Sequence, residues 1–337
     1  MEQPLSFEID MKLKQVGEFG LIDLIKKKTF SKGKKVLLGI GDDAAVLKSN
    51  KNSLQLLTTD ALVEKVHFDL SYFPLKAIGW KGMVANLSDI AAMGGSPQAA
   101  VVTLGISNKF QVEQILSIYS GISEAAKKFK CPVVGGDIVS SPKHLFVSIS
   151  ILGQAKKENL TKRIGAKTGD LIAITGDLGS SLAGLEYLKK NKKSDLSLNR
   201  KFLYPFPRLN ESELIVRFLK PTAMIDISDG LVSELHHIIA ENNLGANIYE
   251  NSIPISKLAL KLAKNSGKKA VNYALYSGEE YELLFTFKAT KIDQFRKLSK
   301  RIKIKIIGKV AEKGKKISLI DAFGKSRYLP FRGYTHF

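Results

Sequence analysis

The chain has 337 residues, of which 44% are hydrophobic and 25% are charged, a balance typical of a globular protein with room for two domains, each with its own core. No apolar run reaches the length of a membrane span, and the N-terminal MEQPLSFEID is acidic rather than apolar, so we expect no membrane association and no signal peptide. The single cysteine, Cys131, excludes an intramolecular disulfide framework. We expect it to be a small core residue at the start of a strand, in a cytoplasmic protein.

The formal net charge is +20, and a value of this size often indicates nucleic-acid binding. Much of the charge lies in residues 189–201, which we interpret as a solvated linker or helix end, and in residues 288–316. Within the second segment, IKIKIIGKV (302–310) alternates lysine with isoleucine, which predicts an edge strand with one wet face. The sequence shows no aromatic interleaving, zinc-ligand spacing or recognition-helix pattern, so we expect no nucleic-acid partner. A basic nucleic-acid-binding protein stays the less favoured alternative.

In the first half of the chain, the sequence predicts strands and helices in alternation. Helices are predicted at 18–30, which is amphipathic, and at 111–130, where apolar residues recur at helical spacing. Strands are predicted at KVLLGI (35–40), SLQLLTT (53–59), AVVTLGI (100–106), CPVVGG (131–136) and LFVSISILGQA (145–155).

The second half mixes the same two kinds of element. LIAITGDLG (171–179) and the residues up to 190 predict a strand, a glycine turn and a helix. SDGLVSELHHIIAEN (228–242) predicts a helix capped by Ser228 or Asp229, and YELLFTF (281–287) and KIKIIGKV (303–310) predict strands. This order indicates an α/β fold with two domains, which we place at residues 1–153 and 154–337.

Aspartates recur at turns that contain Gly, Ser or Thr. A single aspartate beside glycine is usually a turn former or helix cap, but carboxylates gathered at strand ends repel one another unless cations neutralise them. Short carboxylates suit Mg²⁺, and Mg²⁺ indicates a phosphorylated substrate, normally ATP. The sequence has neither a P-loop nor the kinase HRD and DFG motifs. The residues alone therefore predict part of a multi-magnesium cage built from GIGDDAAVL (39–47), TTDAL (58–62), NLSDI (86–90), GGDIV (135–139) and DISDG (226–230).

These motifs belong to a longer series that covers nearly the whole chain. The series is GIGDDAAVL, TTDALVEKVHF, ANLSDIAAMGGSP, VVGGDIV, RIGAKTGD, ITGDLGSSLAGL, AMIDISDGL, SGEEYELLF and GYTHF. In this order it resembles the thiamine-monophosphate kinases, whose superfamily also holds aminoimidazole ribonucleotide synthetase, selenophosphate synthetase and a hydrogenase-maturation protein. The reactive Cys or Sec expected of selenophosphate synthetase is absent, and the VHF and GYTHF segments favour the thiamine branch over the purine branch.

The resemblance implies a fold and a reaction. An N-terminal α/β domain would pair its sheet with that of a second copy in a homodimer, a C-terminal α/β domain would follow, and the site would lie between the domains. The enzyme would transfer the γ-phosphoryl group of ATP directly to the phosphate of thiamine monophosphate. Because the incoming phosphate is already a competent nucleophile, catalysis would consist of neutralising and aligning two polyanions. Another ATP-dependent member of the superfamily, acting on a different small acceptor, is the open alternative.

The resemblance also implies roles for particular residues. Several magnesium ions would be bound by Asp42, Asp43, Thr58, Thr59, Asp60, Asp89, Asp137, Asp226 and Asp229, of which Asp43, Asp60, Asp137 and Asp229 would be catalytic. ATP would contact Gly136, Asp137, Arg163 and Ser228. Thiamine monophosphate would contact His67, Glu280, Phe331 and Tyr334, although His67 alone could be a core or surface residue and the terminal aromatic residues could only dock the tail.

Two positions depart from the family pattern. Lys65 stands in VEKVHF where the family usually has glycine, and Ser277 begins SGEE where the family usually has GGED. Glu280 keeps the charge of aspartate and extends its reach by one methylene group. We expect these departures to affect the fit of the substrate and not the class of reaction.

Overall fold

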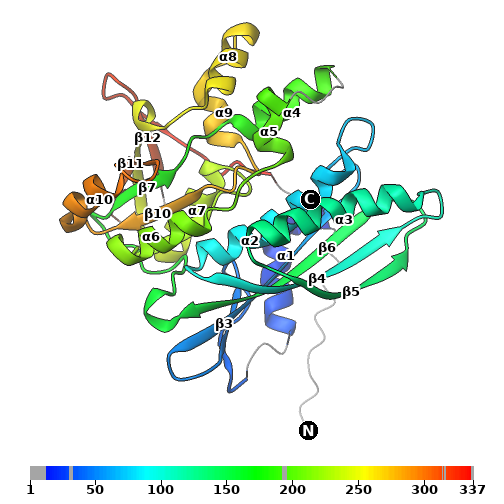
Figure 1. Ribbon diagram of the computed structural model, residues 1–337. Coiled ribbons are helices and arrows are strands. Elements are labelled where there is room, and N and C mark those ends of the chain that lie inside the picture. The colour runs from blue at the N-terminus through cyan, green and yellow to red at the C-terminus, as the bar shows by residue number, and fades with distance from the viewer. Residues whose placement is uncertain (1–12, 30–32, 192–195, 313, 315, 335–337) are drawn as a thin grey trace.

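The computed structural model describes the chain except residues 1–12, 30–32, 192–195, 313, 315 and 335–337 (Figure 1). Helices and strands are mixed along both halves, which confirms the predicted α/β class. The strands are β1 (Val36–Leu38), β2 (Ala45–Lys48), β3 (Ser53–Val63), β4 (Ser96–Ile106), β5 (Val133–Ser140), β6 (Phe146–Lys156), β7 (Leu171–Thr175), β8 (Ala223–Asp226), β9 (Gly245–Tyr249), β10 (Leu283–Phe287), β11 (Ile304–Ala311), β12 (Ile317–Ile320) and β13 (Ser326–Tyr328).

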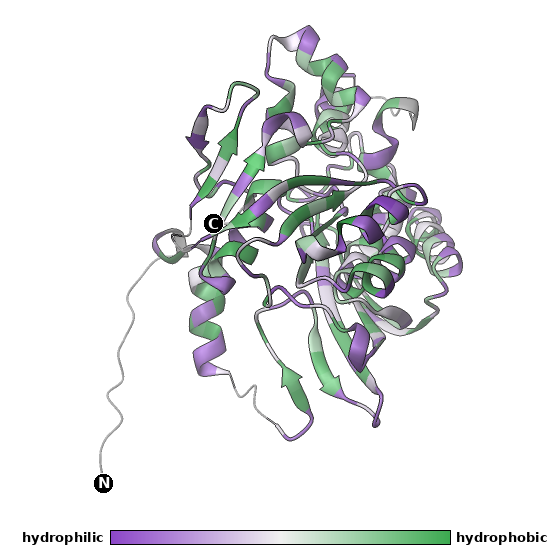
Figure 2. Cartoon of the chain, turned by 90° about the vertical axis from the view of Figure 1, so that its left-hand side faces the viewer, coloured by the Kyte–Doolittle hydropathy of each residue, from purple (hydrophilic) through white to green (hydrophobic). Residues whose placement is uncertain are grey.

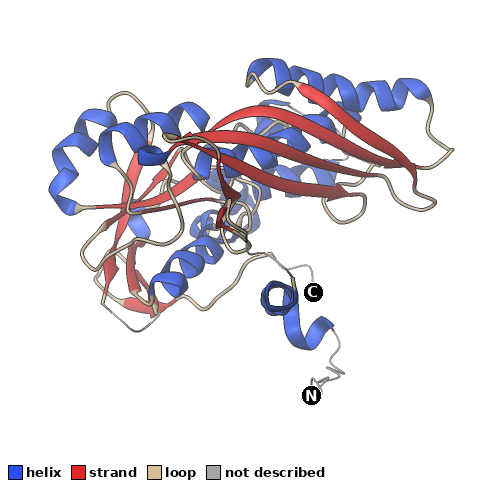
Figure 3. Ribbon diagram, turned by 90° about the horizontal axis from the view of Figure 1, so that it is seen from below, coloured by secondary structure: helices blue, strands red, loops and turns tan. Residues whose placement is uncertain are grey.

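The helices lie mainly on the faces of the two sheets that these strands form (Figure 3). They are α1 (Leu13–Lys28), α2 (Leu75–Ala92), α3 (Val112–Lys128), α4 (Ser180–Asn191), α5 (Leu196–Leu203), α6 (Leu209–Leu219), α7 (Leu231–Asn242), α8 (Lys257–Ser266), α9 (Ala270–Tyr276) and α10 (Ile292–Leu298), with short 3₁₀ turns at Lys157–Asn159, Glu250–Ser252 and Ala289–Lys291. Among the described helices, none combines the length and the apolar character that crossing a bilayer requires.

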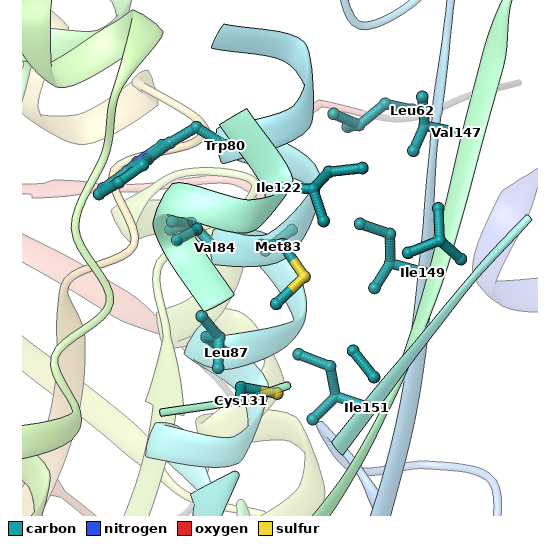
Figure 4. Packing of buried hydrophobic residues seen from close by; sticks show 14 of the residues in the cluster. Leu62, Trp80, Met83, Val84, Leu87, Ile122, Cys131, Val147, Ile149 and Ile151 are labelled. Atoms are coloured by element: carbon teal, nitrogen blue, oxygen red, sulfur yellow. The ribbon is translucent and has the colours of Figure 1, made fainter. Parts of the chain in front are cut away.

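The N-terminal sheet has the order β1-β2-β3-β6-β4-β5, in which only β4 and β5 run parallel. Alternation along β3 sends Leu56, Thr58 and Leu62 to the buried face, and leaves Leu57 and Thr59 exposed on the other. Helices α2 and α3 cover the buried face, and Figure 4 shows their side chains meeting those of β6 there. On the opposite face, here called the open face, described side chains such as Leu57 and Val101 are exposed.

The C-terminal sheet has the order β13-β12-β9-β11-β7-β10-β8. Strands β7 and β10 of this sheet are mainly hydrophobic (Figure 2) and are buried along almost their whole length, because helices cover both sides there. On β7, Ile172 and Ile174 pack into the cluster that includes α7 and α9, whereas Ala173 packs into the cluster that includes α6 and α10. The predicted edge strand at 302–310 is wrong, because β11 lies between β9 and β7. Alternating lysines show that one face is wet, and an interior strand can also have a wet face.

Helix α2 is the element that joins the two domains. Of its 18 residues, 15 are buried; most of the hydrophobic ones pack in the cluster of the N-terminal sheet, and two of its side chains donate hydrogen bonds to the second half of the chain. Trp80 Nε1 donates to the carbonyl oxygen of Pro205 at 2.7 Å, and Ser88 Oγ donates to Asp226 Oδ2 at 2.6 Å. The sequence pattern indicates no helix here, because a helix buried on all sides has no amphipathic period.

The start of helix α7 differs from its prediction, whereas the position of Cys131 agrees with its prediction. Helix α7 begins after Gly230, whose φ is 117°, and neither Ser228 nor Asp229 caps it, so the predicted cap is wrong. The glycine lets the chain turn sharply, which places Ser228 and Asp229 outside the helix. Cys131 is buried two residues before β5, as predicted. In the basic segment, Lys189 and Lys190 are exposed in the last turn of α4, and residues 192–195 lie outside the described chain.

Candidate active site

Carboxylates from both domains converge at one place beside α2. Asp43 lies in the turn before β2, Asp89 in the last turn of α2, and Asp226 at the end of β8. One ligand oxygen from each lies within 4.8 Å of the others. The structure thus brings together three of the predicted ligands from separate parts of the sequence.

Strand β3 adds polar groups on the same side. Thr58 and Asp60 are two residues apart, so both side chains are on the face of β3 that is turned toward α2, where Thr58 Oγ1 donates to Asp89 Oδ2. Asp60 is solvent-accessible. Partial loss of water around it, and then the charges of Asp229 and Asp43, raise its pKa to about 6. Asp60 and Asp229 therefore extend the cluster toward solvent.

The cluster has strongly unfavourable electrostatics as an isolated set of anions. Burial first, and then the neighbouring charge of Asp43, raise the pKa of Asp42 to about 7 and that of Asp226 to about 8. Burial likewise raises the pKa values of Asp43 and Asp89. Each of these shifts means that the folded protein disfavours the ionised carboxyl group, and that a cation between them would be bound favourably.

Arg163 is the cation that compensates the cluster in this structure. Its Nη2 lies 2.5 Å from Asp43 Oδ1, and its backbone N–H donates to Asp42 Oδ2 at 3.3 Å. The second oxygen of Asp43 is buried and has no hydrogen-bond partner among the described residues. A buried carboxylate oxygen without a partner, beside two further carboxylates, fits the hard oxygen ligand set that Mg²⁺ prefers.

The raised pKa values predict a metal-dependent pH profile of stability. When a chelator has removed metal ions, each carboxyl group with a raised pKa stabilises the folded protein at low pH. That contribution is lost as the pH rises from 3.8, the usual pKa of aspartate, to the raised pKa values of about 6, 7 and 8 for Asp60, Asp42 and Asp226. Thermal unfolding should therefore show a Tm that falls between pH 4 and pH 8 without metal, and that Mg²⁺ restores most at pH 8. A Tm at pH 8 that does not respond to Mg²⁺ would contradict a metal site here. Asp226→Asn should flatten the metal-free profile.

Three predicted site residues lie elsewhere on the N-terminal sheet. The Thr59 hydroxyl is on the open face of β3, where it donates to the Ile149 carbonyl oxygen at 3.2 Å and accepts from Ser150. Gly136 and Asp137 are on β5, which is separated from β3 by β6 and β4, a distance of about 14 Å at the usual strand spacing. A Cβ at Gly136 would lie 2.0 Å from the Val102 carbonyl oxygen, so the close approach of β4 already requires glycine there.

Glu234 is a site residue that the sequence analysis missed. It is buried in the first turn of α7, and its Oε1 accepts from the Asp229 backbone N–H at 3.0 Å and from Ser228 Oγ at 3.4 Å. Burial, followed by the charge of Asp229, raises its pKa well above the usual value. Glu234 therefore fixes the Ser228–Asp229 turn. In the sequence, Glu234 follows Ser228 by six residues in SDGLVSE. Nothing in this spacing distinguishes it from an ordinary acidic residue in a helix.

The two adjacent glutamates of SGEE have different surroundings. Glu280 is buried, and its Oε1 accepts from the backbone N–H groups of Gly179 and Ser181 at 2.7 and 3.0 Å. It thereby binds the amino end of α4, and its Oε2 lies 3.2 Å from Lys201 Nζ. Oε1 therefore holds the amino end of α4 in place, whereas the buried Oε2 has its ion-pair contact with Lys201 and no hydrogen-bond partner among the described residues.

Glu279 is turned in another direction, with a φ of 56°. Its side chain is 26% exposed and its Oε2 lies 2.5 Å from Lys81 Nζ. The pKa of Tyr334 is raised, first by the burial of its own side chain and then by the negative charge of Glu279. The charges of Glu18 and Asp229 also contribute. The backbone N–H of Tyr334 donates to the Asp229 carbonyl oxygen at 3.4 Å. Glu279 and Tyr334 thus lie beside the Asp229 end of the cluster.

His67 and Phe331 have local packing roles in the structure. His67 Nδ1 accepts from the Val63 backbone N–H at 3.0 Å, just after β3. Lys65 in the same turn has a φ of 67°, a conformation that favours glycine and explains why glycine suits this position. The Lys65 side chain pairs with Asp69 at 2.9 Å, on the surface. Phe331 packs edge-on against Phe19 of α1, which ties the C-terminal segment to the N-terminal helix.

Two family models match the chain. Residues 41–155 match "AIR synthase related protein, N-terminal domain", and residues 167–321 match the C-terminal domain of the same family. Together with the two sheets and the carboxylates between them, these matches define the chain as a member of the AIR synthase related class.

Relatives within that class are thiamine-monophosphate kinases. The one from Aquifex aeolicus is 37% identical over 90% of this chain and 94% of its own length, and the one from Bacillus subtilis is 34% identical over 95% and 99%. The chain belongs to the thiamine-monophosphate kinase family. The solved structure of AaThiL complexed with AMPPCP and TMP is 33% identical, covers 98% of this chain and all of its own, and has a TM-score of 0.84. Hydrogenase maturation protein HypE in complex with ATP, 16% identical with a TM-score of 0.68, shows the fold alone.

Proposed function

We propose that this chain transfers the γ-phosphoryl group of ATP to thiamine monophosphate and so forms thiamine diphosphate. The observation that carries the proposal is the convergence of Asp43, Asp89 and Asp226 from the two domains. It occurs in a chain that is similar over nearly its whole length to a protein solved with AMPPCP and TMP. A site of this kind supplies positioning and charge neutralisation, which is most of what phosphoryl transfer between two phosphates requires.

The carboxylates would hold several Mg²⁺ ions, and the bound ions would neutralise the phosphate oxygens of both substrates. Asp43 offers the unpartnered buried oxygen, while Asp89 and Asp226 complete the set and Asp60 and Asp229 flank it toward solvent. Arg163 would exchange part of its contact with Asp43 for a phosphate, for which its planar guanidinium group is suited. Asp42 shares Arg163 and would keep it beside the cluster.

The residues proposed to contact ATP, besides Arg163, are Ser228, Gly136 and Asp137. Ser228 adjoins Asp229 in the turn that Glu234 fixes. Gly136 and Asp137 lie on exposed β5, and the open face of the same sheet carries exposed Leu57 and Val101. A homodimer through this face would cover those apolar residues and bring the β5 residues of one copy beside its partner, which is why we retain both residues for ATP binding.

For the acceptor side, we transfer the proposed role from Glu280 to Glu279. Glu280 is occupied at the amino end of α4, whereas Glu279 is partly exposed beside Tyr334 and Asp229. A carboxylate and aromatic rings suit an aminopyrimidine and a cationic thiazolium ring. Phe331 and His67 stay part of the proposal as further residues that would contact thiamine monophosphate.

The pair of glutamates gives a matched test. Glu279→Gln should raise the KM for thiamine monophosphate by about 10-fold or more and leave the KM for ATP nearly unchanged, since a charge-assisted hydrogen bond contributes about 1.5–3 kcal/mol. Glu280→Gln should leave both KM values nearly unchanged and should lower Tm, because it weakens the contacts of α4. Steady-state kinetics and thermal unfolding of both variants decide between them, and the reverse pattern would return the role to Glu280.

The function itself is tested by incubating the purified chain with ATP and thiamine monophosphate, with and without Mg²⁺, and by measuring thiamine diphosphate and ADP. Formation of both in equal amounts, only with Mg²⁺, is expected. A panel of other small acceptors separates this reaction from that of another superfamily member. ADP formation with a different acceptor, and none with thiamine monophosphate, would overturn the proposal.

A further inference from the structure

Lys81 is a buried charge in the middle of the helix that joins the domains. Its side chain is 1% exposed, and its Nζ lies 4.2 Å from the centroid of the Phe202 ring and 5.4 Å from that of Phe73. Its neighbours along α2, Trp80 and Gly82, are buried as well. Removing an ammonium group from water is unfavourable unless a counter-charge or aromatic faces compensate it.

The counter-charge is Glu279, and it comes from the other domain. Lys81 Nζ lies 2.5 Å from Glu279 Oε2. The Glu279 backbone N–H donates to the Ser228 carbonyl oxygen at 2.6 Å, and the Tyr281 N–H donates to that of Ile227 at 2.9 Å. The backbone of Glu279 is therefore fixed against the turn that carries Asp229, while its carboxylate is fixed by α2. With both ends held, the side chain has little freedom to choose another direction.

The same helix carries Asp89, two turns beyond Lys81. Helix α2 therefore carries Asp89 in the carboxylate cluster and Lys81 beside Glu279, and the helix fixes the distance between these two residues. Because Lys81 contacts Oε2 and the side chain of Glu279 is 26% exposed, the carboxylate can meet a ligand while it stays paired. A flexible surface glutamate would instead lose side-chain freedom at the moment of binding.

We propose that Lys81 is a positioning residue for the acceptor: it holds the Glu279 carboxylate where thiamine monophosphate would bind, at a set distance from the carboxylate cluster. This inference rests on the proposed function, in which Glu279 contacts thiamine monophosphate. Lys81 itself touches neither substrate. Lys81 would affect the affinity for the acceptor only through Glu279. An experiment can therefore separate this effect from the contribution of Lys81 to the packing of α2.

The test is a double-mutant cycle with acceptor kinetics. Lys81→Met retains the length and the contacts with Phe73 and Phe202 and removes the charge. It should raise the KM for thiamine monophosphate by about 10-fold or more, with kcat and the KM for ATP within about twofold. In a Glu279→Gln background the same substitution should have almost no further effect on that KM, because the contact it removes is already lost. Lys81→Gln, whose amide can donate to Glu279, should recover part of the affinity.

The control is Lys128 on α3. Its Nζ lies 4.9 Å from the centroid of the Phe206 ring, a similar aromatic contact on an exposed residue, and Lys128→Met should leave all three kinetic constants unchanged. An unchanged acceptor KM in folded Lys81→Met would overturn the proposal, as would an equal rise in the Glu279→Gln background. Failure of both Lys81 variants to fold, while Glu279→Gln folds, would assign Lys81 to stability alone. Wild-type protein without activity on thiamine monophosphate would overturn the proposed function instead.

Discussion

Asp43→Asn is expected to fold normally and to lose at least about 100-fold in turnover, a loss of roughly 2.7 kcal/mol of transition-state stabilisation. Asparagine has nearly the shape of aspartate, so the turn before β2 is preserved. It removes the charge from a carboxylate that has a buried oxygen without a hydrogen-bond partner among the described residues and that has a ligand oxygen within 4.8 Å of those of Asp89 and Asp226. The measurement is kcat at saturating ATP, acceptor and Mg²⁺, with thermal unfolding to confirm folding.

The matched control for Asp43 is Asp293→Asn. Asp293 is 77% exposed on α10 and makes only a surface pair with Arg296, so its kinetic constants should be those of the wild-type protein. Near-normal turnover of Asp43→Asn at saturating Mg²⁺ would contradict the aspartate cage. A loss that higher Mg²⁺ largely restores would show that Asp43 contributes to metal affinity more than to the transition state.

Glu282→Gln is expected to produce the largest loss of stability, about 3–5 kcal/mol, because it breaks a buried ion pair from one side. Glu282 is fully buried and binds Arg208 through both oxygens, at 2.6 and 2.8 Å, while Lys201 Nζ lies 2.9 Å away. Thr175 Oγ1 donates to it at 2.6 Å. The glutamine would leave both cations without their common counter-charge in the protein interior.

The pH dependence of the Glu282 contribution has a definite sign. Although burial acts against it, pairing with Lys201 and Arg208 lowers the pKa of Glu282 to about 2. Its contribution is complete above the unfolded value of about 4.3 and is lost as the pH falls toward 2. Urea unfolding should show a difference between wild-type and Glu282→Gln that is constant from pH 5 to 8 and shrinks below pH 4. A difference below about 0.5 kcal/mol at pH 7 would show that the network adds little.

The strands were predictable where one face is buried and the other wet. Strand β6, and β3 from Leu54 to Thr59, were predicted as strands, and both show a two-residue alternation of buried and less buried side chains. Helix α2 was not predictable by the same means, since contact with both domains makes nearly all of it apolar or small. Whether the 302–310 strand was at an edge or inside the sheet depended on which strands pair with it, and periodicity contains no such information.

The site was predictable in its chemistry and less so in its geometry. The recurring aspartates indicated a cation site, and Asp43, Asp89 and Asp226 do meet, although Asp89 lies within helix α2 and Asp226 within β8, not at the predicted turns. The direction of the two adjacent glutamates was not visible in SGEE. It follows from positive φ angles at Glu279 and Tyr281, 56° and 51°, which tertiary contacts impose on residues that rarely adopt them.

The shared packing of α2 has a consequence for biosynthesis. The hydrophobic cluster of the N-terminal sheet includes Phe202, Leu203 and Tyr281, so part of the surface of α2 is completed by residues synthesised much later. About 125 residues separate the end of β6 from Tyr281, which at ordinary translation rates corresponds to about 6 to 25 s. During that interval the nascent N-terminal half leaves the ribosome with an apolar surface uncovered. Chaperone occupancy of ribosome-bound chains should therefore persist until residue 281 has emerged and fall once it has.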